Sequence, residues 1–80
     1  MDVKTQVRDV IINLLKLKPE ELKDEINLQD SIGVDSTEMV ETVIALEKTF
    51  GVKLSPKEIS KTCSVNDIEK VIQGKLGGKQ

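Results

Sequence analysis

The chain has 80 residues, of which 38% are hydrophobic and 32% charged, and its formal net charge at pH 7 is −2. A chain of this size forms one small domain, and it has neither an apolar run long enough to span a bilayer nor a secretory signal pattern. Histidine is absent and Cys63 is the single cysteine, which excludes an internal disulfide and the usual zinc ligand sets. We therefore expect a cytoplasmic protein without membrane insertion or a metal site, in which Cys63 is a small apolar residue near the core.

The charges are divided unevenly along the sequence. Residues 1–50 contain eleven acidic and six basic residues, whereas residues 51–80 contain three acidic and six basic residues. The first part of the chain should therefore attract basic partners. Nucleic acid is not expected as a partner, because the lysines are scattered and Phe50 is the only aromatic residue.

The N-terminal segment predicts an amphipathic helix that ends before Pro19, because its apolar residues are spaced three and four apart. They are Val3, Val7, Val10, Ile11, Leu14 and Leu15. Residues 18–34 follow as a long connection that contains the turn-forming residues Asn27, Asp30, Ser31 and Gly33. We expect this connection to be ordered, because apolar side chains recur in it and can hold it on the core. These side chains are Leu22, Ile26, Leu28 and Ile32.

A second helix is predicted to follow Asp35 and to end at Phe50. Asp35 is a favourable N-cap residue, Glu38 three residues later completes a capping box, and Gly51 fits the left-handed position after a helix. The segment Ser55-Pro56-Lys57-Glu58 predicts a further helix of one or two turns that holds Ile59.

The last helix is predicted to begin at Ser64. Its inward face consists of Val65, Ile68, Val71, Ile72 and Leu76. Gly74, Gly77 and Gly78 should fray its end. The sequence therefore predicts an all-α, four-helix bundle with three main helices, one short helix and a long loop between the first and second helices. The domain should cover residues 1–76, and residues 77–80 should form a flexible tail.

The predicted helix that follows Asp35 divides into distinct faces at 100° per residue. One face is the expected core stripe and contains Met39, Val43, Leu46 and Phe50. A neighbouring strip contains Ser36, Thr37, Val40, Ile44 and Glu47, with Glu41 at its edge. Val40 and Ile44 can widen the buried face, can form the apolar centre of a docking surface with an acidic rim, or can do both in part.

Ser36 occupies the start of this helix, and it cannot belong to a serine–histidine pair in a chain without histidine. One interpretation is an ordinary N-terminal serine that helps to satisfy backbone N–H groups. The other is an attachment site for a group added by another enzyme. A phosphodiester on Ser36 would lie at the positive end of the helix dipole, where anions are favoured.

From about Val3 to Ile72 the chain resembles the acyl carrier proteins. The resemblance includes the first helix, the long loop, the segment Asp-Ser-Ile-Gly-Val-Asp-Ser at residues 30–36, and Val-Glu-Thr-Val-Ile-Ala-Leu-Glu at residues 40–47. It departs from the usual Asp-Ser-Leu motif at Thr37, and Lys48 and Thr49 occupy positions where the family often has acids. These departures leave the attachment site in place but put the pathway in doubt.

The resemblance implies that a phosphopantetheinyl transferase attaches 4′-phosphopantetheine from coenzyme A to Ser36, and that the thiol of this arm carries acyl groups as thioesters. It implies a monomer with no catalytic residues of its own, which serves fatty-acid, polyketide or specialised lipid synthesis. Acyl-loading and acyl-processing enzymes would bind it through basic patches. Carried over position by position, the docking residues are Asp35, Thr37, Glu38, Val40, Glu41, Ile44 and Glu47.

Two other functions remain open at this stage. Carriers of aminoacyl or peptidyl groups share the fold and the serine, so the sequence separates them only weakly from acyl carriers. An unmodified helical adaptor would use the acidic first part of the chain and would not need Ser36. A further hypothesis is that the almost entirely aliphatic interior admits the acyl chain and shelters its thioester from water.

Overall fold

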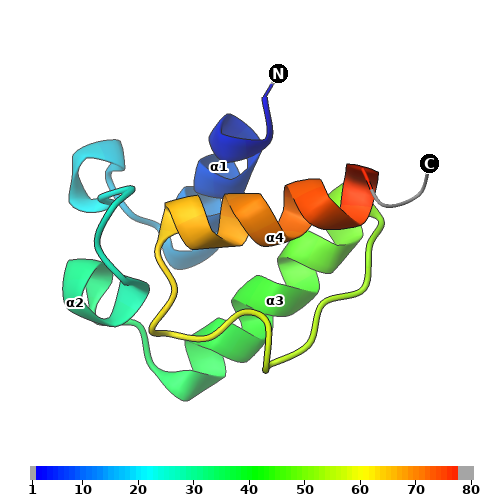
Figure 1. Ribbon diagram of the computed structural model, residues 1–80. Coiled ribbons are helices and arrows are strands. Elements are labelled where there is room, and N and C mark those ends of the chain that lie inside the picture. The colour runs from blue at the N-terminus through cyan, green and yellow to red at the C-terminus, as the bar shows by residue number, and fades with distance from the viewer. Residues whose placement is uncertain (1, 78–80) are drawn as a thin grey trace.

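The computed structural model describes residues 2–77, and the elements that it forms are helices joined by loops (Figure 1). The elements in chain order are α1 (Val3–Leu15), a 3₁₀ helix η1 (Pro19–Glu21), α2 (Leu28–Ile32), α3 (Ser36–Phe50) and α4 (Val65–Gly77). No strand occurs within residues 2–77. Helix α1 packs against both α3 and α4. The predicted all-α bundle of three main helices and one short helix is confirmed.

The helix ends follow local sequence signals. Asp2 Oδ1 accepts a hydrogen bond from the Thr5 N–H (2.7 Å) at the start of α1. At the start of α4, Ser64 and Asp67 each donate a backbone N–H to the other side chain, which is a reciprocal capping box. Gly51 ends α3 with a φ of 68°, a left-handed conformation that glycine adopts without the steric cost of a Cβ.

One continuous apolar core joins all four helices and the connections. Its buried apolar residues are Val7, Ile11, Leu22, Leu28, Val34, Met39, Leu46, Val52, Leu54, Ile59, Val65, Ile68 and Ile72. Cys63 packs against this core, as predicted. The predicted inward positions of Leu14 and Ile26 are wrong, because both side chains are exposed. Leu14 lies in the last turn of α1, and the fully buried Leu28 holds the connection on the core where Ile26 does not.

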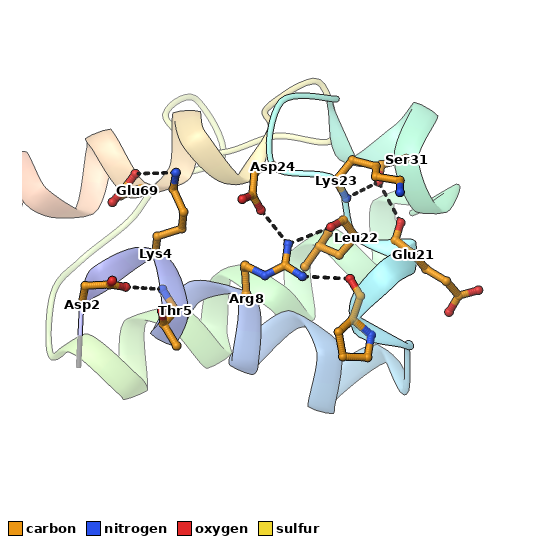
Figure 2. A network of polar contacts seen from close by, with 11 residues as sticks. Asp2, Lys4, Thr5, Arg8, Glu21, Leu22, Lys23, Asp24, Ser31 and Glu69 are labelled. Carbon is orange, nitrogen blue, oxygen red and sulfur yellow. Dashed lines mark hydrogen bonds and ion pairs between the residues drawn. The ribbon is translucent and has the colours of Figure 1, made fainter.

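The long connection between α1 and α2 is held by a polar network centred on Arg8 (Figure 2). The Arg8 guanidinium donates to the Leu22 carbonyl (2.7 Å), the Asp24 carboxylate (2.6 Å) and the Pro19 carbonyl (2.8 Å). The Ser31 hydroxyl donates to the Glu21 carbonyl (3.2 Å), which ties the connection to α2. This segment is therefore ordered by polar contacts as well as by burial.

The short helix lies at a different place from the predicted one. Residues 28–32 form α2, because Asn27 accepts from the Asp30 N–H (2.9 Å) and Gly33 ends the helix in a left-handed conformation. The predicted helix after Ser55 is a single turn, in which the Glu58 and Ile59 N–H groups both donate to the Ser55 carbonyl. The chain bends at Ile59, whose side chain is buried in the core, and cannot continue as a helix.

Helix α4 continues through Gly74 to Gly77, although glycines were predicted to fray it there. The remaining residues of the predicted tail, 78–80, lie outside the described residues. Within residues 2–77 no helix is both long and apolar enough to cross a membrane. The same residues contain no group of three or more cysteine, aspartate or glutamate side chains placed to hold a metal ion.

Candidate functional site around Ser36

Ser36 is the first residue of α3, and its side chain is exposed. The helix begins there because Asp35 and Glu38 form the predicted capping box. The Glu38 N–H donates to Asp35 Oδ1 (2.8 Å), and the Asp35 N–H donates to Glu38 Oε1 (3.1 Å). Both carboxylates that flank Ser36 in the sequence are therefore bound to backbone N–H groups at the helix end.

A cavity of about 330 Å³ opens beside Ser36. One wall is the first half of α3, and the other is the segment that follows α3 in the sequence and precedes α4. The residues around the cavity are Ser36, Met39, Val40, Val43, Ile44, Pro56, Ile59, Ser60 and Lys61. Its interior is thus mostly aliphatic, with the two serines and one lysine as the polar groups.

The two apolar residues on the strip of α3 next to Ser36 are exposed. Val40 is 57% exposed and Ile44 is 46% exposed, although both also line the cavity. Exposed aliphatic side chains at successive turns of a helix form an apolar surface that a partner can cover. These exposures favour a docking surface, while the half-buried part of each side chain lines the cavity.

The predicted acidic residues around this surface differ in their surroundings. Glu41 is exposed on α3, as is Thr37. Glu47 is half-buried, and its carboxylate accepts a hydrogen bond from the Leu54 N–H (2.8 Å) across the turn that follows α3. Glu38 is half-buried in the capping box. Glu41 is thus the member of the set whose side chain has no structural partner within residues 2–77.

Sequence reasoning missed two features of this region. Thr42 is fully buried on α3, where its hydroxyl donates to the Glu38 carbonyl (2.8 Å), so a polar residue is accommodated in the core. The second wall of the cavity, with Pro56, Ile59 and Lys61, was not assigned to the site. Its proximity to Ser36 depends on long-range pairing between residues 61–63 and α2, which leaves no local signal in the sequence.

The site presents the exposed Ser36 hydroxyl without an activating base beside it in the sequence. No histidine occurs in the chain, and the carboxylates of Asp35 and Glu38 are engaged by backbone N–H groups. This arrangement does not activate Ser36 as a nucleophile for catalysis by the chain itself. The first turn of α3 has backbone N–H groups without intrahelical acceptors, and the aliphatic cavity lies beside it. A phosphodiester on the hydroxyl and an apolar group in the cavity both fit this arrangement.

Comparison with known proteins relates nearly the whole chain to one family of carriers. A family model described as a phosphopantetheine attachment site matches residues 5–72. The acyl carrier protein of Campylobacter curvus is 39% identical over 77 residues, which cover 96% of this chain and 99% of that protein. The acyl carrier protein of Campylobacter hominis is 34% identical over 73 residues, which cover 91% and 92% of the two chains. The chain therefore belongs to the acyl carrier protein family, whose members are carriers and not enzymes and whose prosthetic group is phosphopantetheine.

Proposed function

We propose that Ser36 is the residue to which 4′-phosphopantetheine is attached, and that the chain presents acyl groups to partner enzymes from this position. The observation that carries the proposal is the exposed Ser36 hydroxyl at the first position of α3, directly beside an aliphatic cavity. When bound, the group supplies a terminal thiol that carries an acyl chain as a thioester.

The attachment step needs a second protein. The Ser36 oxygen forms a bond to the phosphorus of the pantetheine side of coenzyme A, while the pyrophosphate bond of coenzyme A breaks and adenosine bisphosphate leaves. The serine proton has to pass to the transferase, because Asp35 and Glu38 are held in the capping box. The role of this chain is to present the hydroxyl on a rigid helix end.

The docking surface that we propose has Val40 and Ile44 at its centre and Glu41 and Thr37 beside them. The exposure of these four side chains supports a direct role in partner contact. Asp35, Glu38 and Glu47 contribute negative charge to the surface while their carboxylates also bind backbone N–H groups. A partner with a basic patch around an apolar centre fits this surface best, and one monomer of the chain carries it completely.

The proposed cargo is an acyl chain, and the aliphatic cavity supports it over an aminoacyl group. Aliphatic walls favour a hydrocarbon chain, whereas a charged ammonium group would lose hydration there. The pathway that we propose is fatty-acid, polyketide or specialised lipid synthesis in the cytoplasm, where coenzyme A supplies the arm. Incubating the loaded chain with acid-activating ligases for fatty acids and for amino acids distinguishes the two cargo classes.

Intact-protein mass spectrometry tests the proposal directly. The chain is incubated with coenzyme A and a broad-specificity phosphopantetheinyl transferase whose activity is verified on another carrier. We expect a gain of one phosphopantetheine, and no gain in the Ser36→Ala variant. If the chain gains nothing, or if Ser36→Ala gains the same mass, Ser36 is not the attachment site. Retained biological function of Ser36→Ala would favour the unmodified adaptor.

A further inference from the structure

Lys61 is the one charged residue among the described side chains that line the cavity beside Ser36. Its side chain is half-buried, and it belongs to the wall opposite α3. An ammonium group at the edge of an aliphatic cavity favours an anionic partner, because partial burial weakens its hydration. This lysine lines the site, but the proposed function gives it no role.

Helix α2 sets the positions of both Lys61 and Ser36. The N–H groups of its first turn donate to the other wall of the cavity, from Gln29 to the Lys61 carbonyl (2.9 Å) and from Leu28 to the Cys63 carbonyl (2.9 Å). The other end of α2 is separated from Ser36 only by residues 33–35. Helix α2 therefore holds both the backbone of Lys61 and the position of Ser36, so both residues are fixed on the walls of the cavity by the same helix.

The charge of Lys61 is not neutralised by a carboxylate of the described chain. The ion pairs within residues 2–77 join Lys4 to Glu69, Arg8 to Asp24 and Lys75 to Glu58. Asp35 and Glu38, the acids beside Ser36 in the sequence, instead bind each other's backbone N–H groups. The same cavity is thus lined by an unpaired cation and by the residue to which the proposed function adds a phosphodiester.

We propose that Lys61 binds the phosphodiester of the phosphopantetheine attached to Ser36 and thereby directs the arm across the cavity, between α3 and residues 56–61. This inference rests on the proposed attachment at Ser36. Lys61 acts as a positioning residue, since it contacts the phosphate and not the thioester at the far end of the arm. The backbone N–H groups in the first turn of α3 complete the surroundings of the anion.

Nuclear magnetic resonance of the loaded chain tests this role without any enzyme assay. The ³¹P resonance of the phosphodiester and contacts between the Val40 methyl groups, which line the cavity in both proteins, and the methyl groups of the arm are measured in the wild type and in Lys61→Gln. Lys57→Gln is the matched control, because Lys57 is exposed on the same segment and does not line the cavity. We expect Lys61→Gln to lower the ratio of bound to free arm by about 1.5- to fivefold, the range for a partly exposed ion pair.

The expected pattern has three parts. Lys61→Gln shifts the ³¹P resonance towards that of a free phosphodiester and weakens the methyl contacts, whereas Lys57→Gln leaves both unchanged. Lys61→Arg keeps the charge and retains most of the bound population. In about 1 M salt, where the screening length is about 3 Å, the wild type approaches Lys61→Gln.

Two results would overturn the role of Lys61. One is a ³¹P resonance of Lys61→Gln that coincides with that of the wild type at low salt. The other is a shift in Lys61→Arg as large as in Lys61→Gln, which would indicate packing and not charge. Absence of any arm on the wild-type chain after treatment with an active transferase would instead contradict the proposed function, so mass spectrometry before the measurement separates the two failures.

Discussion

The two sides of this small bundle are held together in different ways. On one side, α1, residues 16–27 and α2 are joined to each other and to residues 61–66 by hydrogen bonds, with Arg8 at the centre (Figure 2). We call this the anchored side. On the other side, the first half of α3 and residues 56–61 face each other across the cavity through mostly aliphatic side chains. We call this the cavity side.

Directional contacts thus predominate on the anchored side, where they define one geometry. Non-directional contacts predominate on the cavity side, where an acyl chain can enter. Hydrogen bonds of 2.6–2.8 Å to Arg8 define one geometry for the anchored side. Aliphatic contacts have no preferred direction, so the cavity side can widen at a small cost for each ångström of movement. Rigidity on the anchored side also keeps Ser36 in place, because α2 leads directly into α3.

The largest predicted effect compares one apolar side chain from each side. Leu28 is fully buried in α2, so Leu28→Ala should lower the free energy of unfolding by about 2–5 kcal/mol. Ile44 is 46% exposed on the cavity side, and Ile44→Ala should cost less than about 1 kcal/mol. Urea denaturation of both variants measures the difference. Equal losses would mean that the cavity side is packed as tightly as the anchored side.

The second prediction concerns the length of an acyl chain attached to the arm. If the acyl chain enters the cavity, each buried methylene should stabilise the protein by about 0.8 kcal/mol. In a domain of this size, this raises the melting temperature by several degrees. The melting temperature should therefore rise with chain length and then level off when the cavity is full. Thermal unfolding of the protein loaded with acyl groups of increasing length checks this. A melting temperature that does not depend on the length of the acyl group would exclude its burial in the cavity.

A polar contrast on the anchored side gives the third prediction. Arg8→Met removes the hydrogen bonds to two carbonyls and the pair with Asp24 while keeping much of the aliphatic stem, and it should cost about 1–2 kcal/mol. This estimate is discounted because the Arg8 side chain is partly exposed to solvent. Relative to the wild type, Arg8→Met should accelerate amide hydrogen exchange more in residues 16–27 than in α4. A uniform increase along the whole chain would argue against a local role for Arg8.

The sequence predicts what depends on local signals. Several features follow from signals within a few residues, and each is confirmed. They are the helix periodicity, the capping box of Asp35 and Glu38, the end of α3 at Gly51 and the start of α4 at Ser64. The strip that contains Val40 and Ile44 also follows from periodicity. Its exposure does not follow, because it depends on how far the opposite wall of the cavity lies from α3.

Long-range contacts explain the errors. Asn27 and Gly33 were interpreted as turn residues, yet they cap α2 at its two ends, and a five-residue helix is too short to show a period. Ser55 and Glu58 form one of the two hydrogen bonds expected at a helix start, in which the Ser55 N–H donates to Glu58 Oε2 (3.1 Å), whereas the Glu58 N–H donates to the Ser55 carbonyl. The helix stops after one turn because the next residues are drawn to the core and to α2.

The smallest predicted effect uses the one ion pair that ties residues 55–59 to α4. Lys75 Nζ lies 2.7 Å from Glu58 Oε1, and this contact, together with the Ser55 N–H, holds the pKa of the Glu58 carboxyl below its ordinary value of 4.5. A carboxyl with a lowered pKa in the folded state stabilises the fold above its unfolded-state pKa, and this contribution is lost as the pH falls through the folded-state pKa. As the pH falls below 4.5 and then through the lower folded-state pKa of Glu58, the cavity side should therefore progressively lose its link to α4.

Thermal unfolding of the wild type and Glu58→Gln from neutral pH to about pH 3 tests this link. Glu58→Gln should be slightly less stable at neutral pH and should depend less on pH in the acid range. Asp2→Asn is the control on the anchored side, because the Thr5 N–H lowers the pKa of Asp2 in the same direction from an ordinary value of 3.8. Amide hydrogen exchange of the same variants locates the effect. If only Glu58→Gln changes the exchange rates of residues 55–61, the ion pair acts on the cavity side. If both variants change it equally, acid weakens the bundle as a whole and the two sides are not independent.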